Sequence, residues 1–223
     1  STPISVIAGI GQAARQGVLI KGGEHLETAA RIRAVAFDKT GTLTVGRPAV
    51  TSIVPLAALQ PVPGIEQDDR KQQLLRWTAV AEGGSEHPLA RAILREVKGD
   101  EPIAAADNFE TFAGGGIGAG WQGRRIEIGS PDWLRQRVAD WPTDAQAALE
   151  EIRQRGETLA AISVDGKVFG LLGFADQVRP EAAAALQQLR DGGVRRLVML
   201  TGDHLASAQR VARTLGITEV QAG

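Results

Sequence analysis

The fold class is decided by one stretch of sequence, Ala34-Val35-Ala36-Phe37-Asp38-Lys39-Thr40-Gly41-Thr42. It begins with a short apolar run, which ends abruptly at the carboxylate of Asp38 and continues into a turn that contains Gly41. Such a run is typical of a buried parallel strand that delivers a reactive group to the carboxyl edge of a sheet. The stretch therefore predicts an α/β domain with Asp38 at the edge of its sheet.

A second unit of the same kind lies far downstream. Residues 196–200 form another short apolar run, Thr201-Gly202-Asp203 follows it, and the periodicity predicts a helix over 205–215. A further helix is expected over 180–189, because Pro180 lies near its first turn and Gly192-Gly193 comes just after its end. Strands that alternate with helices indicate a parallel sheet.

The residues between these two units have a different pattern. The dipeptide Asp165-Gly166 between two apolar runs predicts a tight hairpin, and the neighbouring strands alternate as in an antiparallel sheet. Expected strands are 49–55, 116–120, 124–128, 159–164 and 168–174, and expected helices are 68–81, 88–97, 131–138 and 144–155. We therefore expect an α+β domain inserted into a parallel-sheet domain, with boundaries near residues 47 and 174.

Composition narrows the classes of function. The 223 residues carry 25 Lys and Arg against 26 Asp and Glu, so no basic field favours nucleic acid as a partner. The chain has no Cys, which excludes disulfides, thiolate metal sites and thiol nucleophiles within it. A helix is expected over residues 4–20, and it is too short and too polar to cross a bilayer alone.

The residues after the first strand suit chemistry on a phosphoryl group. A carboxylate oxygen of Asp38 can attack phosphorus, while Mg²⁺ and main-chain N–H groups neutralise the phosphate oxygens and Gly41 lets the backbone curl around them. The plainer alternative is a polar turn in which Asp and Thr cap a helix.

These residues carry a resemblance to a known family. Asp38-Lys39-Thr40-Gly41-Thr42 resembles the phosphorylation signature of P-type ATPases, whose phosphorylation domain has a haloacid dehalogenase-like fold with a parallel sheet. Thr201-Gly202-Asp203 resembles that family's second phosphate-site motif. The resemblance implies Asp38 as phosphoryl acceptor, with Asp38 and Thr40 as ligands of Mg²⁺. It also places six residues around the phosphate and the metal: Lys39, Thr40, Thr42, Thr201, Gly202 and Asp203.

The inserted segment resembles the heavy-metal-transporting members of that family. Ser85-Glu86-His87-Pro88 is similar to their Ser-Glu-His-Pro element, which implies that His87 and Glu82 line an adenine pocket. Asp176 begins a segment that resembles the family's hinge, and the resemblance implies that Asp176 is one of the ATP-binding residues. The glycines that the resemblance places beside ATP are Gly114, Gly116 and Gly129.

The resemblance also implies a domain division and a setting. Residues 1–30 would be a stalk and the end of a transmembrane helix, residues 31–47 and 175–223 the phosphorylation domain, and residues 48–174 the nucleotide-binding domain. The chain would act at the cytoplasmic face of a membrane and serve export of a divalent heavy-metal cation bound by the membrane part. Ser1-Thr2-Pro3 favours zinc, cadmium or lead over copper.

The chain departs from the family pattern at its carboxyl end. A phosphate-contacting Lys and a Gly-Asp-Gly-x-Asn-Asp segment are not found, so we expect an incomplete phosphorylation domain, a weakened Mg²⁺ site and better binding of ATP than phosphorylation. The alternatives are a soluble haloacid dehalogenase-type phosphatase and a non-catalytic ATP-binding module. Such phosphatases usually carry an Asp as general acid and base two positions after the nucleophile, where this chain has Thr40.

Overall fold

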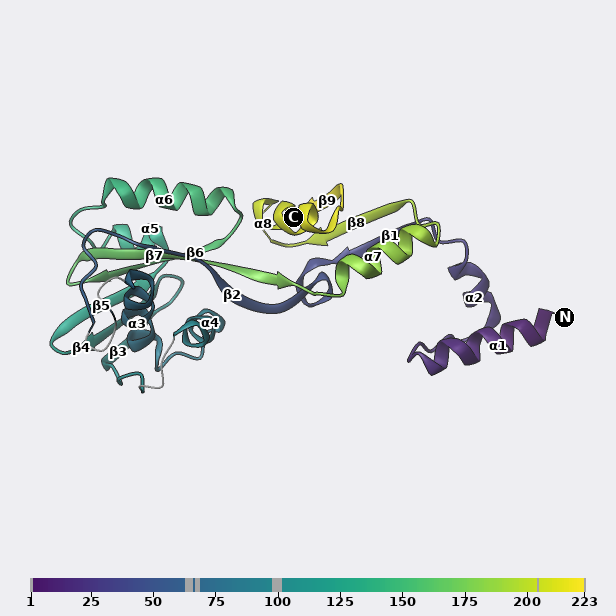
Figure 1. Ribbon diagram of the computed structural model, residues 1–223, viewed down its shortest axis with the longest axis horizontal. Helices are drawn as coiled ribbons and strands as arrows, with labels where there is room; N and C mark the ends of the chain where they lie inside the picture. Colours follow the sequence, from purple (N-terminus) through teal and green to yellow (C-terminus); the bar gives the residue numbers. More distant parts are fainter. Residues whose placement is uncertain (1, 63–65, 67–68, 98–101, 204, 223) are drawn as a thin grey trace.

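The computed structural model describes residues 2–62, 66, 69–97, 102–203 and 205–222, which form two sheets joined by a pair of long strands (Figure 1). The smaller sheet is parallel and has the order β1-β8-β9. Its strands are β1 (Ala34–Asp38), β8 (Arg196–Thr201) and β9 (Glu219–Ala222). Helices α7 (Ala182–Asp191) and α8 (Leu205–Leu215) pack on it around the buried side chains of Leu186, Met199 and Val211. The predicted parallel α/β unit is confirmed.

The larger sheet is antiparallel and has the order β2-β7-β6-β5-β4-β3. Its strands are β2 (Thr44–Pro55), β3 (Asp107–Phe112), β4 (Gly116–Trp121), β5 (Arg124–Gly129), β6 (Thr158–Val164) and β7 (Lys167–Val178). Helices cover both faces of this sheet (Figure 1). They are α3 (Arg70–Glu82) and α4 (Pro88–Glu96) on one face, and α5 (Pro131–Arg135) and α6 (Thr143–Gln154) on the other. The predicted antiparallel α+β unit is confirmed.

Each face of the larger sheet has its own core. Leu74 of α3 packs with Phe169 and Ile126 on one face, whereas Leu149 of α6 packs with Leu171 on the other. All five side chains are essentially fully buried. Strand β7 is therefore apolar toward both faces, which explains why its sequence is a continuous apolar run.

The hairpin between β6 and β7 turns at Asp165-Gly166, as predicted. Both residues have positive φ, 50° and 73°, which is the geometry of a type I′ turn. The Asp165 carboxylate also accepts hydrogen bonds from the Arg125 backbone N–H and the Arg124 guanidinium, 2.9 and 2.8 Å away. These bonds join the turn to β5 and lower the pKa of Asp165.

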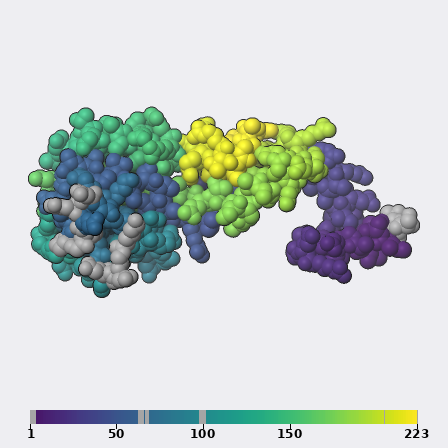
Figure 2. Space-filling view, in the orientation of Figure 1, coloured from purple at the N-terminus to yellow at the C-terminus, as the bar shows by residue number. Residues whose placement is uncertain are grey.

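Strands β2 and β7 connect the two sheets. Strand β2 begins at Thr44, directly after the loop that follows β1, and β7 ends at Val178, shortly before α7. Both strands therefore run across the predicted boundaries at residues 47 and 174. The molecule is elongated, with the larger sheet at one end and the amino-terminal helices at the other (Figure 2).

The amino-terminal segment forms two separate helices, α1 (Thr2–Arg15) and α2 (Gly23–Ala29). The prediction of helix through residue 20 is wrong, because Gly17 adopts φ +81° and the N–H groups of Gly17 and Val18 cap the last turn of α1. No helix among the described residues combines the length and the apolar character that a membrane span requires.

Other boundaries and two strands also differ from the prediction. Helix α5 ends at Arg135 and not at residue 138, and α7 begins at Ala182 and not at residue 180. The predicted start of α3 at residue 68 lies outside the described residues. Strands β3 and β9 were not predicted, because β3 is polar and exposed at an edge and β9 is short.

Candidate active site

The loop after β1 forms one irregular turn over Lys39–Leu43. Gly41 adopts φ +77° with open space around its Cα, and Thr40 has an extended conformation, so the turn is not a regular helix. The Thr44 backbone N–H closes the turn by donating to the Lys39 carbonyl. Asp38, the last residue of β1, is exposed at the carboxyl end of the sheet, as predicted for a reactive carboxylate.

An ion pair joins this loop to the end of β8. The Lys39 side chain is only 5% exposed, and its ammonium contacts the Asp203 carboxylate. The Asp203 backbone N–H in turn donates to the Thr201 hydroxyl, 3.1 Å away. Asp38 pairs with Leu200 in the sheet, so the ends of both strands lie at the same level. The fold thus brings the two sequence motifs together.

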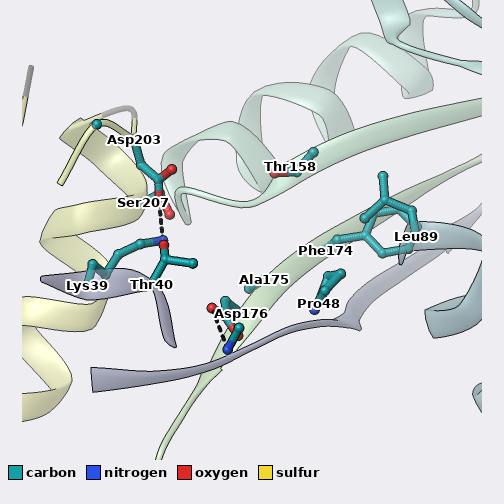
Figure 3. A pocket seen from close by; sticks show the side chains of 12 residues that line it. Lys39, Thr40, Pro48, Leu89, Thr158, Phe174, Ala175, Asp176, Asp203 and Ser207 are labelled. Carbon is teal, nitrogen blue, oxygen red and sulfur yellow. Dashed lines mark hydrogen bonds and ion pairs between the residues drawn. The ribbon is translucent and has the colours of Figure 1, made fainter. Parts of the chain in front are cut away.

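A cavity of about 420 Å³ opens between this pair of motifs and the larger sheet. Lys39, Thr40, Gly202 and Asp203 line it from the smaller sheet. Ser207 of α8 lies beside Asp203, and the side chains of Leu89, Thr158 and Phe174 lie across the cavity from them (Figure 3). Asp38, Thr42 and Thr201 do not line this cavity; Asp38 and Thr42 are exposed and Thr201 is half-buried at the end of its strand.

Asp176 lies on β7 near the end of the β2–β7 pair that is next to the smaller sheet. Its Oδ2 accepts hydrogen bonds from the Thr44 hydroxyl and the Gly46 N–H at 2.5 and 3.1 Å, and its Oδ1 accepts from the Arg47 N–H at 3.0 Å. Asp176 lines the smaller cavity, and its carboxylate is engaged by the backbone of the opposite strand. Its contacts hold the two connecting strands together.

Two arginines that the sequence analysis did not single out hold the same junction. The Arg179 guanidinium donates to the Gly41 carbonyl at 2.9 Å, and its backbone N–H donates to the Leu43 carbonyl at 2.9 Å. Arg210 of α8 donates to the Asp176 carbonyl at 3.2 Å. Arg179 could have been found from its position in the hinge-like segment, whereas Arg210 carries no local signal.

A second cavity, of about 690 Å³, lies on the larger sheet. Its lining includes five of the six residues that the sequence analysis counted with ATP binding: Glu82, His87, Gly114, Gly116 and Gly129. The sixth, Asp176, lines the smaller cavity instead. Leu89, Thr158 and Phe174 line this cavity and the smaller one. The two cavities are therefore neighbours that share a wall.

Glu82 is a buried acid within the larger cavity. Glu82 is the last residue of α3 and is 8% exposed. Its Oε2 has no hydrogen-bond partner among the described residues. Burial raises the pKa of Glu82, and a hydrogen bond with the Ser85 side chain acts in the opposite direction. A carboxyl group in this setting can donate or accept a hydrogen bond to a polar ligand edge.

His87 is exposed at the start of α4. Its Nδ1 accepts a hydrogen bond from the Leu89 backbone N–H at 3.2 Å and so caps the helix. Because this bond uses the lone pair of Nδ1, the neutral ring carries its proton on Nε2. The imidazole can then donate from Nε2 to a ligand.

The glycines of the larger cavity have different structural roles. Gly116 and Gly129 face each other in the β4–β5 pair, and a Cβ on Gly116 would lie 2.6 Å from the Gly129 Cα. A Cβ on Gly115 or Gly129 would collide with the indole of Trp133. Gly114, in contrast, has φ +72° and open space beside it. Only Gly114 combines a positive φ with unobstructed access from the cavity.

Stacked side chains pack against these glycines. The Arg137 guanidinium lies 4.7 Å from the Phe112 ring centroid and 4.8 Å from that of Trp133. It also pairs with the buried Glu127 carboxylate of β5 at 2.6 Å. These contacts fix the indole against the glycine loop. The sequence analysis missed them, because they join residues that share no local motif.

The donor groups at the end of β1, beside the smaller cavity, suit a metal that is shared with a phosphate. Among the described residues there is no group of three or more His, Cys, Asp or Glu side chains that could hold an ion. The Asp38 carboxylate and the Thr40 carbonyl are the candidates that the sequence analysis named. Mg²⁺ commonly binds through one or two carboxylates, several waters and substrate phosphates, so this sparse set fits it.

Comparison with known proteins places the chain among relatives. Residues 32–222 match the family described as haloacid dehalogenase-like hydrolase. Over 223 residues the chain is 44% identical to the zinc-exporting P-type ATPase of Mycobacterium marinum, covering 100% of this chain and 29% of that protein. It is also 44% identical over 223 residues to the manganese-exporting P-type ATPase of Mycobacterium bovis, covering 100% of this chain and 30% of that protein.

A solved structure gives the same result. The fold is similar to that of a zinc-transporting PIB-type ATPase in the E2.Pi state, with a TM-score of 0.83 and 38% identity, covering 100% of this chain and 34% of that chain. The chain thus spans about three tenths of the length of the curated relatives. The resemblance to heavy-metal-transporting P-type ATPases and the expected combination of folds are confirmed.

Proposed function

The chain belongs to the haloacid dehalogenase-like hydrolase family, and from this premise we propose that it is the ATP-binding and phosphorylated part of a P-type ATPase that exports a heavy-metal cation. In this proposal residues 48–174 bind the nucleotide and residues 31–47 with 175–223 receive the phosphoryl group. Residues 1–30 form the stalk toward the membrane. The chain acts at the cytoplasmic face of that membrane.

The observation that carries the proposal is the shared wall of the two cavities. Glu82 and His87 supply polar groups at the larger cavity, and Lys39 with Asp203 lies at the smaller one. A nucleotide held at the first site can extend its phosphates past Thr158 toward the second. Closure of the two sheets would then bring the γ-phosphate to Asp38.

The reaction proposed for Asp38 consists of two successive displacements at the γ-phosphorus of ATP. A carboxylate oxygen of Asp38 forms a bond to the γ-phosphorus while the bond from that phosphorus to the β–γ bridging oxygen breaks, and ADP leaves. Water later attacks the same phosphorus, the acyl-phosphate bond breaks, and inorganic phosphate and the free carboxylate result. Lys39 supplies a positive charge at the phosphate, and its pairing with Asp203 orients it.

In this proposal the remaining residues have supporting roles. Main-chain groups around Gly41 and the Thr42, Thr201 and Gly202 positions would contact phosphate oxygens. Mg²⁺ held by the Asp38 carboxylate, the Thr40 carbonyl and water would offset the negative charge of those oxygens. Thr40 cannot serve as a general acid, which favours a persistent phosphoenzyme over the rapid turnover of a phosphatase.

The proposed cargo is a divalent cation. The Ser1-Thr2-Pro3 sequence supports zinc, cadmium or lead over copper, and the zinc-exporting relative agrees with this order. The manganese-exporting relative has the same identity to the chain, so manganese joins the proposed set. The cation itself would bind to a membrane part of the protein and not to these residues.

Phosphorylation of Asp38 is tested with ATP labelled at the γ-phosphate. A protein that continues this chain through the Gly-Asp-Gly-x-Asn-Asp segment is expected to acquire an acid-stable label that Asp38→Asn abolishes. Asp140→Asn is the matched control, because Asp140 is exposed and lines neither cavity. A label that persists in Asp38→Asn would exclude this acceptor. Steady release of phosphate from small phosphomonoesters would favour the phosphatase instead.

A further inference from the structure

Strand β3 contains an irregularity at the wall of the larger cavity. Asp107 pairs with Gly120 and Glu110 with Gly118, so two residues of β3 stand opposite one residue of β4. The first of them, Asn108, has φ +50°, which is uncommon for a residue other than glycine. A bulge of this kind interrupts the alternation of side chains and re-aims one of them, and bulges are frequent beside functional sites.

The side chain at this bulge is the Phe109 ring. It is 39% exposed, although large apolar side chains are usually buried, and it lines the larger cavity. The ring makes no contact with another aromatic ring among the described residues. The nearest atoms to a Cβ built on Gly84 are those of the Phe109 ring, 3.8 Å away, so the ring lies beside the loop that follows α3.

The same cavity provides polar groups of a different kind. The Glu82 side chain is more than nine-tenths buried, lines the cavity, and leaves one oxygen without a partner among the described residues. His87 also lines the cavity and has Nε2 available to donate. A flat, heteroaromatic ligand uses both kinds of group, because its face stacks on an aromatic ring and its edge forms hydrogen bonds.

We propose that Phe109 is the residue on which the nucleobase stacks, and that the bulge at Asn108–Phe109 exists to present this ring to the cavity. The inference rests on the proposed function, since it concerns how the nucleotide is held. Phe109 contacts the face of the base, while Glu82 and His87 remain available for polar groups of the ligand. Stacking of this type tolerates any base, so Phe109 contributes affinity for the base more than discrimination between bases.

The experiment compares ligands with and without a base. The unaltered chain and the variants Phe109→Ala, Phe109→Leu and Phe109→Trp are titrated by calorimetry with ATP and with ribose 5-triphosphate, which has no base. Phe109→Ala is expected to weaken ATP binding about tenfold or more, the range that base stacking on aromatic residues commonly gives. Phe109→Leu, which keeps apolar volume without a π face, is expected to weaken it as well, and Phe109→Trp to retain it. Affinity for ribose 5-triphosphate is expected to be equal in all four.

The matched control is Ile32→Ala, which removes another large apolar side chain of similar exposure, 43%, remote from the cavity. It is expected to bind ATP like the unaltered chain. A spectroscopic readout accompanies the titrations: in Phe109→Trp, ATP is expected to change the fluorescence of the new indole, and ribose 5-triphosphate is not. Far-UV circular dichroism verifies that each variant is folded.

Two results would overturn the stacking role. One is ATP binding by Phe109→Ala that equals that of the unaltered chain. The other is an equal loss of affinity for ATP and for ribose 5-triphosphate, which would indicate a structural role for the ring. If the unaltered chain does not bind ATP, both the proposed function and the stacking role are wrong. If it binds ATP and the Phe109 variants give either result above, only the stacking role is wrong.

Discussion

Replacing Asp203 with Asn tests the ion pair that joins the two sequence motifs. The substitution keeps the shape of the side chain and removes its charge, which leaves the Lys39 ammonium in a site where its side chain is only 5% exposed. Breaking a fully buried pair costs about 3–5 kcal/mol. The Asp203 side chain is 44% exposed, so water can partly solvate the remaining charge, and we expect a lower cost of about 2 kcal/mol.

The measurement is urea unfolding followed by two probes. With a denaturant slope of about 2 kcal/mol/M, a loss of about 2 kcal/mol moves the midpoint down by about 1 M. Circular dichroism reports on both sheets, whereas indole fluorescence reports on the larger one. All tryptophans of the chain lie in the segment with the larger sheet: Trp77, Trp121, Trp133 and Trp141. The shift should therefore be greater by circular dichroism than by fluorescence.

A double-mutant cycle decides whether the effect comes from the pair. In the Lys39→Met background no ammonium needs a counter-charge, so Asp203→Asn is expected to cost about 0.5 kcal/mol or less. Asp191→Asn, at an exposed position of the same sheet domain, is the control and should leave the midpoint unchanged. An equal cost of Asp203→Asn in both backgrounds would refute the reasoning, because the coupling free energy would then be zero.

Three further predictions concern the larger cavity. His87→Ala should weaken ATP binding in calorimetry and leave the far-UV spectrum unchanged; equal affinity would contradict its place in the pocket. Burial raises the folded-state pKa of Glu82 above its ordinary value of 4.5, so folding stability contributed by its proton is present at low pH and is lost as pH rises through the raised pKa. As pH rises, the urea midpoint of the unaltered chain should therefore fall relative to that of Glu82→Gln. Midpoints of the two proteins that change in parallel with pH would contradict this prediction. Gly116→Ala should lower the free energy of unfolding by about 1–3 kcal/mol through overpacking of β4 on β5, whereas Gly114→Ala should cost about 1–2 kcal/mol through its positive φ and also weaken ATP binding. If Gly116→Ala and Gly114→Ala have equal stability but Gly116→Ala loses more ATP affinity, Gly116 and not Gly114 is the glycine that admits the ligand.

The sequence was informative where local patterns determine structure. The apolar run before Asp38 and the run before Thr201 became neighbouring parallel strands, and the Asp165-Gly166 turn has the positive φ angles that its hairpin requires. Strand β3 escaped prediction because its letters, Asp-Asn-Phe-Glu-Thr-Phe, are polar and it lies at the sheet edge, where no second strand imposes an apolar face.

The support of the candidate site could not be predicted, because it depends on contacts between distant residues. Nothing in the local sequence pairs Arg137 with Glu127 or sets Trp133 against Gly115. The glycines illustrate the difference. The resemblance predicts these glycines beside ATP, but only the packing separates Gly116, which is closed off by Gly129, from Gly114, which is open. One residue type thus serves strand pairing at one position and access at the other.

The junction between the sheets links the orientation of the larger sheet to the geometry of the loop after Asp38. Asp176 on β7 holds the Thr44 hydroxyl at the start of β2, and that hydroxyl oxygen lies 3.0 Å from the Lys39 carbonyl. Arg179, three residues further along, holds the Gly41 carbonyl at 2.9 Å. Both connecting strands are therefore bonded at their bases to the same loop.

A tilt of the larger sheet about this junction must strain or break those bonds, since a few element-terminal residues absorb the change in a hinge motion. Both bonds include a charged partner, and the bond between Thr44 and Asp176 is also short and partly buried, so they resist independent movement of strand and loop. The loop that carries Lys39 and Thr40 should consequently move with the connecting strands and not separately from them. If the larger sheet binds nucleotide as proposed, its movement has a direct mechanical route to the loop after Asp38, through Asp176 and Arg179, without passing through the cores of the two sheets.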